Sequence, residues 1–532
     1  METADQIIKE FEYYDARRAN WLEYFAEIAR FVIPMKDNVY GNRSKGDRRG
    51  EDLFDTTAIH ANELLASALH SMLTNPTVMW MWMSTGDFKL DSQDDVRKYI
   101  QDCVQAMHSV LNNSNFQTEV HEMFLDECAW GTGFLMMEED DEDVVRFTAR
   151  PIYESCIGEN NKGVVDKAYR SFKWTASQIL EEAEWVKNIP EDVLYKMKNN
   201  LDEEWEIIHC VKPRPNGKTR AKVRSLKEAK FAECYVLRQP RITLEETGRY
   251  RFPFKTPRWS KISGEVYGRS PAMKCLPEIK MLNEMRKNII RADQLNTAPP
   301  MVVPDDGFIL PIQLKPYGFT FYRSGSQDKI EPLLQNIKLN ITQDQIKETR
   351  EMILKAFFID QLQLRDGPQM TATEVMQRSD ENLRLLSPSI GRHYNEFLKP
   401  VAEDLFDIML RKNMFPKAPA SLKGKQVNFV FASAIAKAQL STEVQKIQKA
   451  LNAISGIASV QPQVLDYVDG DNLTKYVFNA LGVPQHVIKD EKDVKDTRTA
   501  RAEAQQQQAR MIEEQHAAEV TNKTAPALGA VE

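Results

Sequence analysis

Residues that could do chemistry occur in this sequence only in incomplete arrangements. Gly217-Lys218-Thr219 resembles the end of a phosphate-binding loop, but Lys212 stands where the loop requires a glycine. His121-Glu122 begins like a zinc-protease helix, but position 125, where the second histidine would fall, is Leu. The sequence contains neither G-x-S-x-G nor G-x-G-x-x-G. We therefore predict no catalytic residue and no cofactor. The alternative is an active site that abundant carboxylates assemble only in three dimensions.

The histidines and cysteines also lack the spacing of metal ligands. Eight histidines are spread along the chain, and six cysteines contain no C-x-x-C pair. We predict no metal site and no disulfide, because free cysteines usually behave as small buried apolar residues. The expected buried thiols are those of Cys103, Cys128, Cys156, Cys210, Cys234 and Cys275.

Length and composition describe an ordinary globular protein. The chain has 532 residues, enough for three or four units of about 150 residues each, and 42% of the residues are hydrophobic. A net charge of −7 excludes a protein that coats DNA by bulk positive charge, so any DNA contact must be local. The longest apolar run, residues 78–83, is far shorter than the about 20 residues that span a bilayer. The N-terminus lacks a secretory core, which predicts assembly in the cytoplasm and no membrane insertion.

Apolar spacing predicts a mainly helical α+β fold. Residues 5–33 carry one apolar stripe and precede Pro34. Asp55-Thr56-Thr57 can cap a second helix, and from Ser270 a helix of about 25 residues runs to Pro299-Pro300. Strands are expected at 80–83 and 425–435, and the tail from 489 is expected to be helical at most near its start. The buried face of the second helix is expected to hold Ile59, Leu64, Leu65, Ala68, Leu69 and Met72.

Two segments concentrate charge of opposite sign. Six consecutive acids between two apparent strands predict an exposed hairpin tip rather than a cation site: Glu138, Glu139, Asp140, Asp141, Glu142 and Asp143. Residues 212–261 hold 15 Lys or Arg against 4 Asp or Glu, a local net charge of +11. This basic stretch could face DNA, pair with the acidic tip of the same or a neighbouring subunit, or form a solvated rim.

Three sequence words in this order resemble the portal, or head-to-tail connector, proteins of short-tailed bacteriophages, the podoviruses of the Autographiviridae type. The words are Leu53-Phe54-Asp55-Thr56-Thr57-Ala58, then Tyr267-Gly268-Arg269-Ser270-Pro271 with Leu276-Pro277-Glu278-Ile279, then Met370-Thr371-Ala372-Thr373-Glu374. The similarity covers about residues 5–490. The resemblance implies a structural protein without enzymatic activity, which forms a ring, usually of twelve subunits, at one capsid vertex. Double-stranded DNA would be packaged and later ejected through this ring.

The resemblance also implies a division of the chain, with long stem helices, an α/β wing and clip, and a helical crown. The expected parts are an α/β wing (1–266, completed by a long bent helix and strand at 371–440), two stem helices (267–297 and 341–360), a clip (298–340), a channel loop (361–370), a helical crown (441–490) and a flexible tail (491–532).

Charged side chains on the stem helices are the candidates for lining the channel or for pairing neighbouring subunits: Arg286, Lys287, Arg291, Lys347, Arg350 and Lys355. The channel-loop candidates are Gln363, Leu364, Arg365 and Asp366, and the acidic tip is a candidate contact between subunits. The implied partners are the terminase large subunit, tail adaptor and tail tube proteins, major capsid and scaffolding proteins, and internal core proteins. The implied location is the virion, at the head-tail junction. The alternative is a capsid-associated protein or DNA-processing enzyme that forms no ring.

Overall fold

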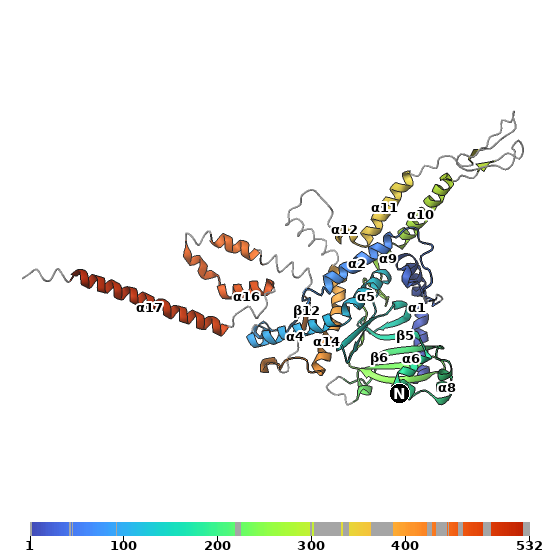
Figure 1. Cartoon of the computed structure of the whole chain (residues 1–532), viewed down its shortest axis with the longest axis horizontal. Helices are drawn as coiled ribbons and strands as arrows, with labels where there is room; N and C mark the ends of the chain where they lie inside the picture. The colour runs from blue at the N-terminus through green and yellow to red at the C-terminus, as the bar shows by residue number, and fades with distance from the viewer. Residues whose placement is uncertain are drawn as a thin grey trace, which may run out of the picture. The chain divides into compact units, whose positions relative to one another are not determined.

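The computed structural model describes residues 3–41, 44, 46–91, 93–218, 225–297, 301–302, 331–332, 340–362, 387–422, 428–431, 444, 446–455, 461–481 and 491–524. These residues form two compact units, and Figure 1 shows the order of their elements. Unit 1 comprises Met1–Trp82, Val104–Phe415 and Phe429–Ile435. Unit 2 comprises Met83–Cys103, Pro416–Asn428 and Ala436–Glu532.

The chain begins with the long helix that its apolar spacing predicts. Helix α1 covers Ala4–Val32, and the 3-10 turn η1 (Pro34–Lys36) follows it. At its start the backbone N–H of Thr3 donates to Gln6 Oε1 at 3.2 Å, which satisfies a donor that the helix itself leaves free. Its apolar stripe is buried, including Ile7, Phe25 and Ile28, which are fully inaccessible to solvent.

A five-stranded antiparallel sheet forms the centre of unit 1, in the order β4-β5-β6-β7-β8. Helix α1 packs on one face, where Ile7 and Phe11 share a core with Ile208. Neighbouring Ile207 points to the other face and packs with Ile179 of α6, as alternation along a strand requires. The strands are β4 (Ser155–Glu159), β5 (Val165–Thr175), β6 (Glu204–Pro213), β7 (Phe231–Leu237) and β8 (Ile242–Arg249), and the helices on the second face are α6 (Ala176–Glu181), α7 (Ala183–Val186) and α8 (Glu191–Asn199).

A smaller antiparallel sheet, β3-β2-β9, carries the predicted hairpin. Next to it, helices α2 and α5 pack against each other. Helix α5 ends at Gly131, whose φ of 78° is the left-handed conformation that favours glycine. The bounds are α2 (Thr57–Leu73), α5 (Phe116–Trp130), β2 (Leu135–Glu139), β3 (Val145–Ala149) and β9 (Phe254–Lys255), with α4 at Asp94–Asn113, η2 at Ile152–Glu154 and η4 at Leu226–Glu228.

A long helical stretch covers residues 387–411 and changes its winding in the middle. Residues 387–393 are α-helical, Tyr394–Leu398 form a π-helical turn, and α14 covers Lys399–Arg411. Pro400 lies in the first turn of α14, which continues directly from the π-helical turn, so its missing N–H removes a backbone donor from the helical stretch. The irregular turn lies directly before this proline, within the segment predicted as a long bent helix. The predicted strands are present as β1 (Met81–Ser84) and β12 (Asn428–Phe431).

Two helices separated along the chain form a hairpin. Helix α10 (Leu276–Thr297) contacts α11 (Asn340–Ala356), and Figure 1 shows them side by side. The short helix α9 (Pro271–Lys274) leads into α10, and α12 (Ile359–Leu362) follows α11. Between the two long helices, β10 (Met301–Val302) pairs antiparallel with β11 (Glu331–Pro332). The other residues between these strands lie outside the described part of the chain.

Unit 2 contains helical segments and ends with α17 (Glu491–Thr524). Helix α17 is longer than the sequence analysis predicts for this tail. Near its start both guanidinium nitrogens Nη1 and Nη2 of Arg498 donate to Asp471 of α16 at 2.6 Å. The other elements of this unit are α3 (Phe88–Asp91), η6 (Ala420–Leu422), a helix at 446–455, η7 (Pro462–Tyr467) and α16 (Gly470–Leu481).

All six cysteines lie among the described residues and are buried, as predicted, and no two of them are bridged. Among the helices of the described ranges, none combines the length and apolar character needed to cross a bilayer.

Candidate functional site

The α10/α11 hairpin is held at its base by the helix cap that the sequence predicts. Ser270 Oγ accepts a hydrogen bond from the backbone N–H of Met273 at 2.9 Å and donates to the carbonyl of Ala129 at 2.6 Å. The cap therefore starts α9 and also ties it to the end of α5. Along the hairpin the buried apolar residues are Leu276, Ile279, Leu282 and Ile289 of α10 and Ile346 and Ile353 of α11.

Two of the six candidate cations on this hairpin point to one buried carboxylate. Arg350 of α11 donates from Nη2 and Nε to Asp55 Oδ2, at 2.5 and 3.1 Å. Arg286 of α10 places its Nε 3.9 Å from the same oxygen. The Asp55 side chain is only 4% exposed. Arg350 is therefore hydrogen-bonded inside its own subunit, and Arg286 makes a longer ion pair with the same carboxylate.

The environment of Asp55 favours its ionised form. Burial alone would raise the pKa of the carboxyl, but hydrogen bonds from Thr57 and Arg350 outweigh it and lower the pKa. The Thr57 N–H donates to Asp55 Oδ1 at 2.9 Å, so the same carboxylate also fixes the start of α2.

The other four candidate cations of the hairpin do not pair with Asp55, and three of them are exposed. Lys287 lies 3.5 Å from Glu284, and its Nζ is 5.9 Å from the centre of the Phe54 ring. Arg291, Lys347 and Lys355 are exposed. Within the described residues none of these three has an ion-pair partner.

The four channel-loop candidates, Gln363, Leu364, Arg365 and Asp366, lie outside the described residues.

Only four of the six acidic residues, Asp140, Asp141, Glu142 and Asp143, lie in the turn between β2 and β3, whereas Glu138 and Glu139 are the last residues of β2. The prediction that all six form the hairpin tip is therefore too broad, and part of the acidic segment is paired within the subunit. Glu138 accepts from Arg249 Nη2 at 3.1 Å, and Glu139 pairs with Arg411. Asp140 Oδ1 accepts from the backbone N–H groups of Glu142 and Asp143, at 2.7 and 3.0 Å, and these two bonds lower its pKa. The side chains of the last three acids, Asp141, Glu142 and Asp143, point to solvent.

The basic stretch 212–261 is mostly neutralised inside the chain. Ten of its fifteen cations have an acidic partner: Lys212, Arg214, Lys218, Arg238, Arg241, Arg249, Arg251, Lys255, Arg258 and Lys261. Several of the partners lie on the 387–411 helical stretch. Lys227 and Lys230 are exposed and have no ion pair in the described ranges, and residues 220, 222 and 224 lie outside them. The stretch is therefore largely an internal network rather than a basic surface.

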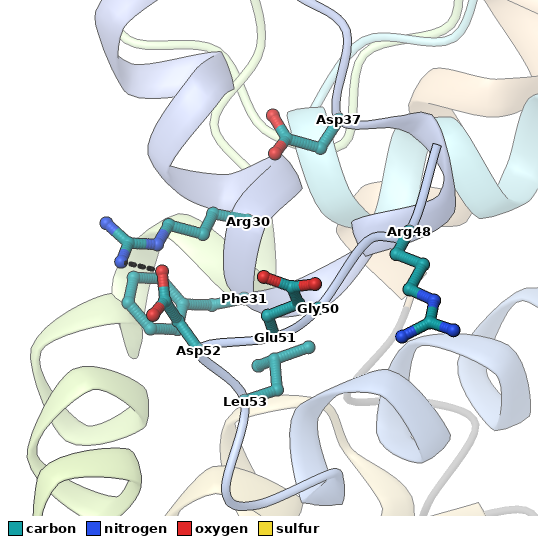
Figure 2. A pocket seen from close by; sticks show the side chains of 8 residues that line it. All are labelled: Arg30, Phe31, Asp37, Arg48, Gly50, Glu51, Asp52 and Leu53. Atoms are coloured by element: carbon teal, nitrogen blue, oxygen red, sulfur yellow. Dashed lines mark hydrogen bonds and ion pairs between the residues drawn. The ribbon is translucent and has the colours of Figure 1, made fainter. Parts of the chain in front are cut away.

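A surface hollow of unit 1 lies where α1 meets the loop that leads to α2 (Figure 2). Its lining is Arg30, Phe31, Asp37, Arg48, Gly50, Glu51, Asp52 and Leu53. Charges of both signs line it, and Arg30 pairs with Asp52 across its rim. Within the described residues no three His, Cys, Asp or Glu side chains are grouped as metal ligands.

The role of Asp55 in joining the two hairpin helices is not among the predictions from the sequence. Asp55 is predicted there only as a helix cap and as part of a sequence word. The position of Asp55 at the start of a predicted helix was the available indication, because an acid at such a position can also pair with cations from other parts of the chain. The cations themselves lie 231 and 295 residues further along the chain.

A family model described as "Bacteriophage head to tail connecting protein" matches residues 4–488. The chain is 28% identical over 508 residues to "Probable portal protein" of Bordetella phage BPP-1, covering 93% of this chain and 91% of that protein. It is also 28% identical over 527 residues to "Portal protein" of Salmonella phage epsilon15, covering 97% and 94%. A solved structure titled "Neck of empty GTA particle computed with C6 symmetry" covers 86% of this chain and 99% of its own, at 10% identity and a TM-score of 0.39. A TM-score of this size does not by itself establish a shared fold.

Proposed function

The chain belongs to the family of bacteriophage head-to-tail connecting proteins, and we propose that it is the portal subunit through which the phage genome enters and leaves the capsid. The observation that carries this proposal is the match of one family model to residues 4–488, nearly the whole chain. The two curated portal proteins, which align over more than nine-tenths of the chain, support it.

We propose that about twelve copies form a closed ring, the number that the resemblance to portal proteins implies. Head-to-tail contacts between identical subunits form such a ring where their rotation closes. The α10/α11 hairpin supports the assignment of 267–297 and 341–360 as stem helices, with 298–340 as the clip between them. Residues 361–370 would form the channel loop. Residues 1–266 and 371–440 would form the wing, 441–490 the crown and 491–532 a C-terminal tail that begins with α17.

A channel for duplex DNA must let it slide in both directions. Every phosphate that a lysine or arginine neutralises adds affinity, which has to be lost again at each step. An acidic chain with a few free cations on its stem helices suits this requirement, and we propose Arg291, Lys347 and Lys355 as the DNA-facing positions. The proposed role involves no chemical step by this chain.

The proposed partners follow from this position in the particle. The clip would bind the terminase large subunit during packaging and the tail adaptor and tail tube proteins afterwards. The wing and crown would contact major capsid, scaffolding and internal core proteins. We propose that the ring assembles in the host cytoplasm and remains in the virion at the head-tail junction.

Native mass spectrometry and negative-stain electron microscopy of the purified chain test the proposal. Twelve copies of the 61.2 kDa chain have a mass of about 730 kDa, and we expect annular particles of about this mass. A chain that stays monomeric or dimeric over a range of salt concentrations would contradict the portal assignment. It would favour the alternative of a capsid-associated protein or DNA-processing enzyme that forms no ring.

A further inference from the structure

The segment 52–57, which we call the strap, joins the loop after α1 to the start of α2. Asn283 of α10 binds its backbone twice. The N–H of Phe54 donates to Asn283 Oδ1 at 2.7 Å, and Asn283 Nδ2 donates to the carbonyl of Asp52 at 2.9 Å. Asn283 is only 7% exposed, so these two bonds are largely protected from water. The side chain of Asn283 therefore fixes helix α10 to the backbone of the strap.

Helix α11 is fixed to the same strap through a side chain. Arg350 reaches Asp55 with two nitrogens, which sets the direction of its guanidinium as well as its distance. Asn283 and Arg286 connect α10 to the strap. Both stem helices therefore contact the strap within the four residues 52–55. Asp55 is the point where α2, α10 and α11 share one charged group.

The negative charge of Asp55 offsets the positive charges of the two arginines next to it. Arg286 and Arg350 are both positive, and each is only partly exposed, at 37% and 40% of its side chain. Arg286 has no other ion-pair partner among the described residues. Without the Asp55 carboxylate, two guanidinium groups would face each other where water screens them incompletely. Repulsion would then act to separate the two helices at their base.

We propose that Asp55 is a positioning residue of the channel, which fixes the stem helices α10 and α11 against the start of α2 and thereby sets where the channel wall lies. This inference rests on the proposed portal function, in which these helices form the stem. Asp55 touches no DNA in this proposal, and its effect reaches the channel only through Arg286 and Arg350.

The test compares purified rings of the unchanged protein with rings of Asp55→Asn by cryo-electron microscopy. Asparagine keeps the size and the hydrogen bond to Thr57 but removes the charge. We expect α10 and α11 to be displaced relative to α2 and the channel width to change. We also expect Asp55→Glu, which restores the charge, to recover part of the original position. Asp55→Asn rings whose stem helices superimpose on the unchanged ring would overturn the proposal.

Asp52→Asn is the matched control. It is the same substitution three residues earlier in the strap, where the carboxylate is 68% exposed and pairs with Arg30 (Figure 2). Its backbone carbonyl, which holds Asn283, is untouched, so we expect its stem helices to remain in place. An equal displacement in Asp52→Asn would overturn the specific role of Asp55.

Arg350→Gln keeps the proposal testable if Asp55→Asn does not fold. This variant leaves Asp55 paired with Arg286 and α10 tied to the strap by Asn283. We therefore expect α11 to move while α10 stays in place, and an unmoved α11 would overturn the proposal. Failure of the portal function has a different signature, because the unchanged protein would then form no ring at all.

Discussion

Glu396 accepts hydrogen bonds from two nitrogens of Arg258, from Nε at 3.0 Å and from Nη2 at 2.7 Å. Glu396 lies in the π-helical turn, and the Arg258 side chain is only 2% exposed. The same guanidinium pairs with Glu159 and donates to the carbonyl of Gly163 at 3.1 Å. Arg258 therefore joins the β4–β5 connection of the large sheet to the 387–411 helical stretch.

Replacing Arg258 with Met should destabilise unit 1 strongly. Methionine fills much of the space but removes the most buried partner of Glu159 and Glu396, which keep only the more exposed Lys261 and Arg392. Breaking a buried ion pair from one side costs about 3–5 kcal/mol. Urea unfolding followed by circular dichroism measures the loss. Lys187→Met is the control, because Lys187 and its partner Glu184 are 65% and 73% exposed. We expect its change to be below about 0.5 kcal/mol, and equal losses in both variants would contradict the prediction.

Asp126 should make stability depend on pH. Burial raises the pKa of its carboxyl to about 6, although Lys36 Nζ lies 2.6 Å away and opposes the rise. The folded protein therefore binds this proton more tightly than the unfolded chain does, whose ordinary value is 3.8. The contribution of the Asp126 carboxyl to the free energy of unfolding is therefore most favourable at acidic pH, and it is lost as the pH rises through about 6. Between about pH 4 and pH 7 the free energy of unfolding should fall by about 2–2.5 kcal/mol from this group, because the unfolded carboxyl is only partly protonated at pH 4.

The Asp126→Asn variant checks this assignment, because asparagine cannot ionise. Urea unfolding at several pH values should show that the unchanged protein loses stability relative to the variant as pH rises from about 4 to 7. Glu122, 2.9 Å from Lys36, remains as a partner for the lysine in both proteins. Parallel pH profiles would contradict the raised pKa of Asp126.

Local patterns in the sequence predict much of the secondary structure. The stripe over residues 5–33 corresponds to α1 at Ala4–Val32, and the cap at Ser270 is present. The prediction that Leu64 is buried is wrong, since it is 45% exposed. Small alanines, at positions 58, 61 and 66, occupy the buried face of α2 instead. The length of α17 also has a local cause, because Ala, Gln, Glu and Arg all favour helix.

Long-range charge pairing could not be predicted in the same way. Lys255 pairs with Asp404, and Arg251 Nε lies 2.7 Å from Asp407, about 150 residues away along the chain. A count of +11 over residues 212–261 suggests a basic surface only if these distant acids are ignored. The same holds for Asp55, whose arginine partners are separated from it by more than 200 residues. Composition gives the number of charged residues in a segment, but the fold determines which of them lack an ion-pair partner.

The exposed cations of the stem helices should act on DNA rather than on assembly. In the triple variant Arg291→Gln, Lys347→Gln and Lys355→Gln we expect intact rings that bind short duplex DNA more weakly and with a less steep salt dependence. Binding titrations at several salt concentrations measure both. Lys280→Gln is the control on α10, since Lys280 is paired with Glu27 at 2.6 Å. Loss of ring formation in the triple variant would instead indicate that these cations join neighbouring subunits.

The free part of the acidic tip is the better place to test contact between subunits. Glu138 and Glu139 already have partners in their own subunit, so reversing them would disturb internal pairs. Reversal of Asp141, Glu142 and Asp143 to Lys should reduce the fraction of chain in rings, as seen in electron micrographs, if the tip meets a basic neighbour. Asp202→Lys with Glu203→Lys reverses another exposed acidic turn as a control. Unchanged ring yields in the tip variant would contradict the subunit contact.

Gly268 and Gly131 approach each other too closely for any side chain. A Cβ atom on Gly268 would lie 2.0 Å from the carbonyl oxygen of Gly131, a distance that requires the backbone to move. That oxygen accepts from the N–H of Trp259 at 3.0 Å, and the Gly268 N–H donates to Thr132 Oγ1 at 2.8 Å. Movement would therefore disturb two buried hydrogen bonds as well. We expect Gly268→Ala to lower stability by about 1–3 kcal/mol or more.

Gly391→Ala provides a control for which we expect the opposite change in stability. Gly391 lies in the helical residues 387–393, and a Cβ atom there would meet nothing within 4 Å. Alanine in a helix interior is favoured over glycine by about 0.5–1 kcal/mol, so this variant should be more stable than the unchanged protein. Thermal unfolding of both variants measures the two shifts. Because each substitution adds one methyl group to a glycine, shifts in the same direction would show that close packing at Gly268 does not determine the outcome.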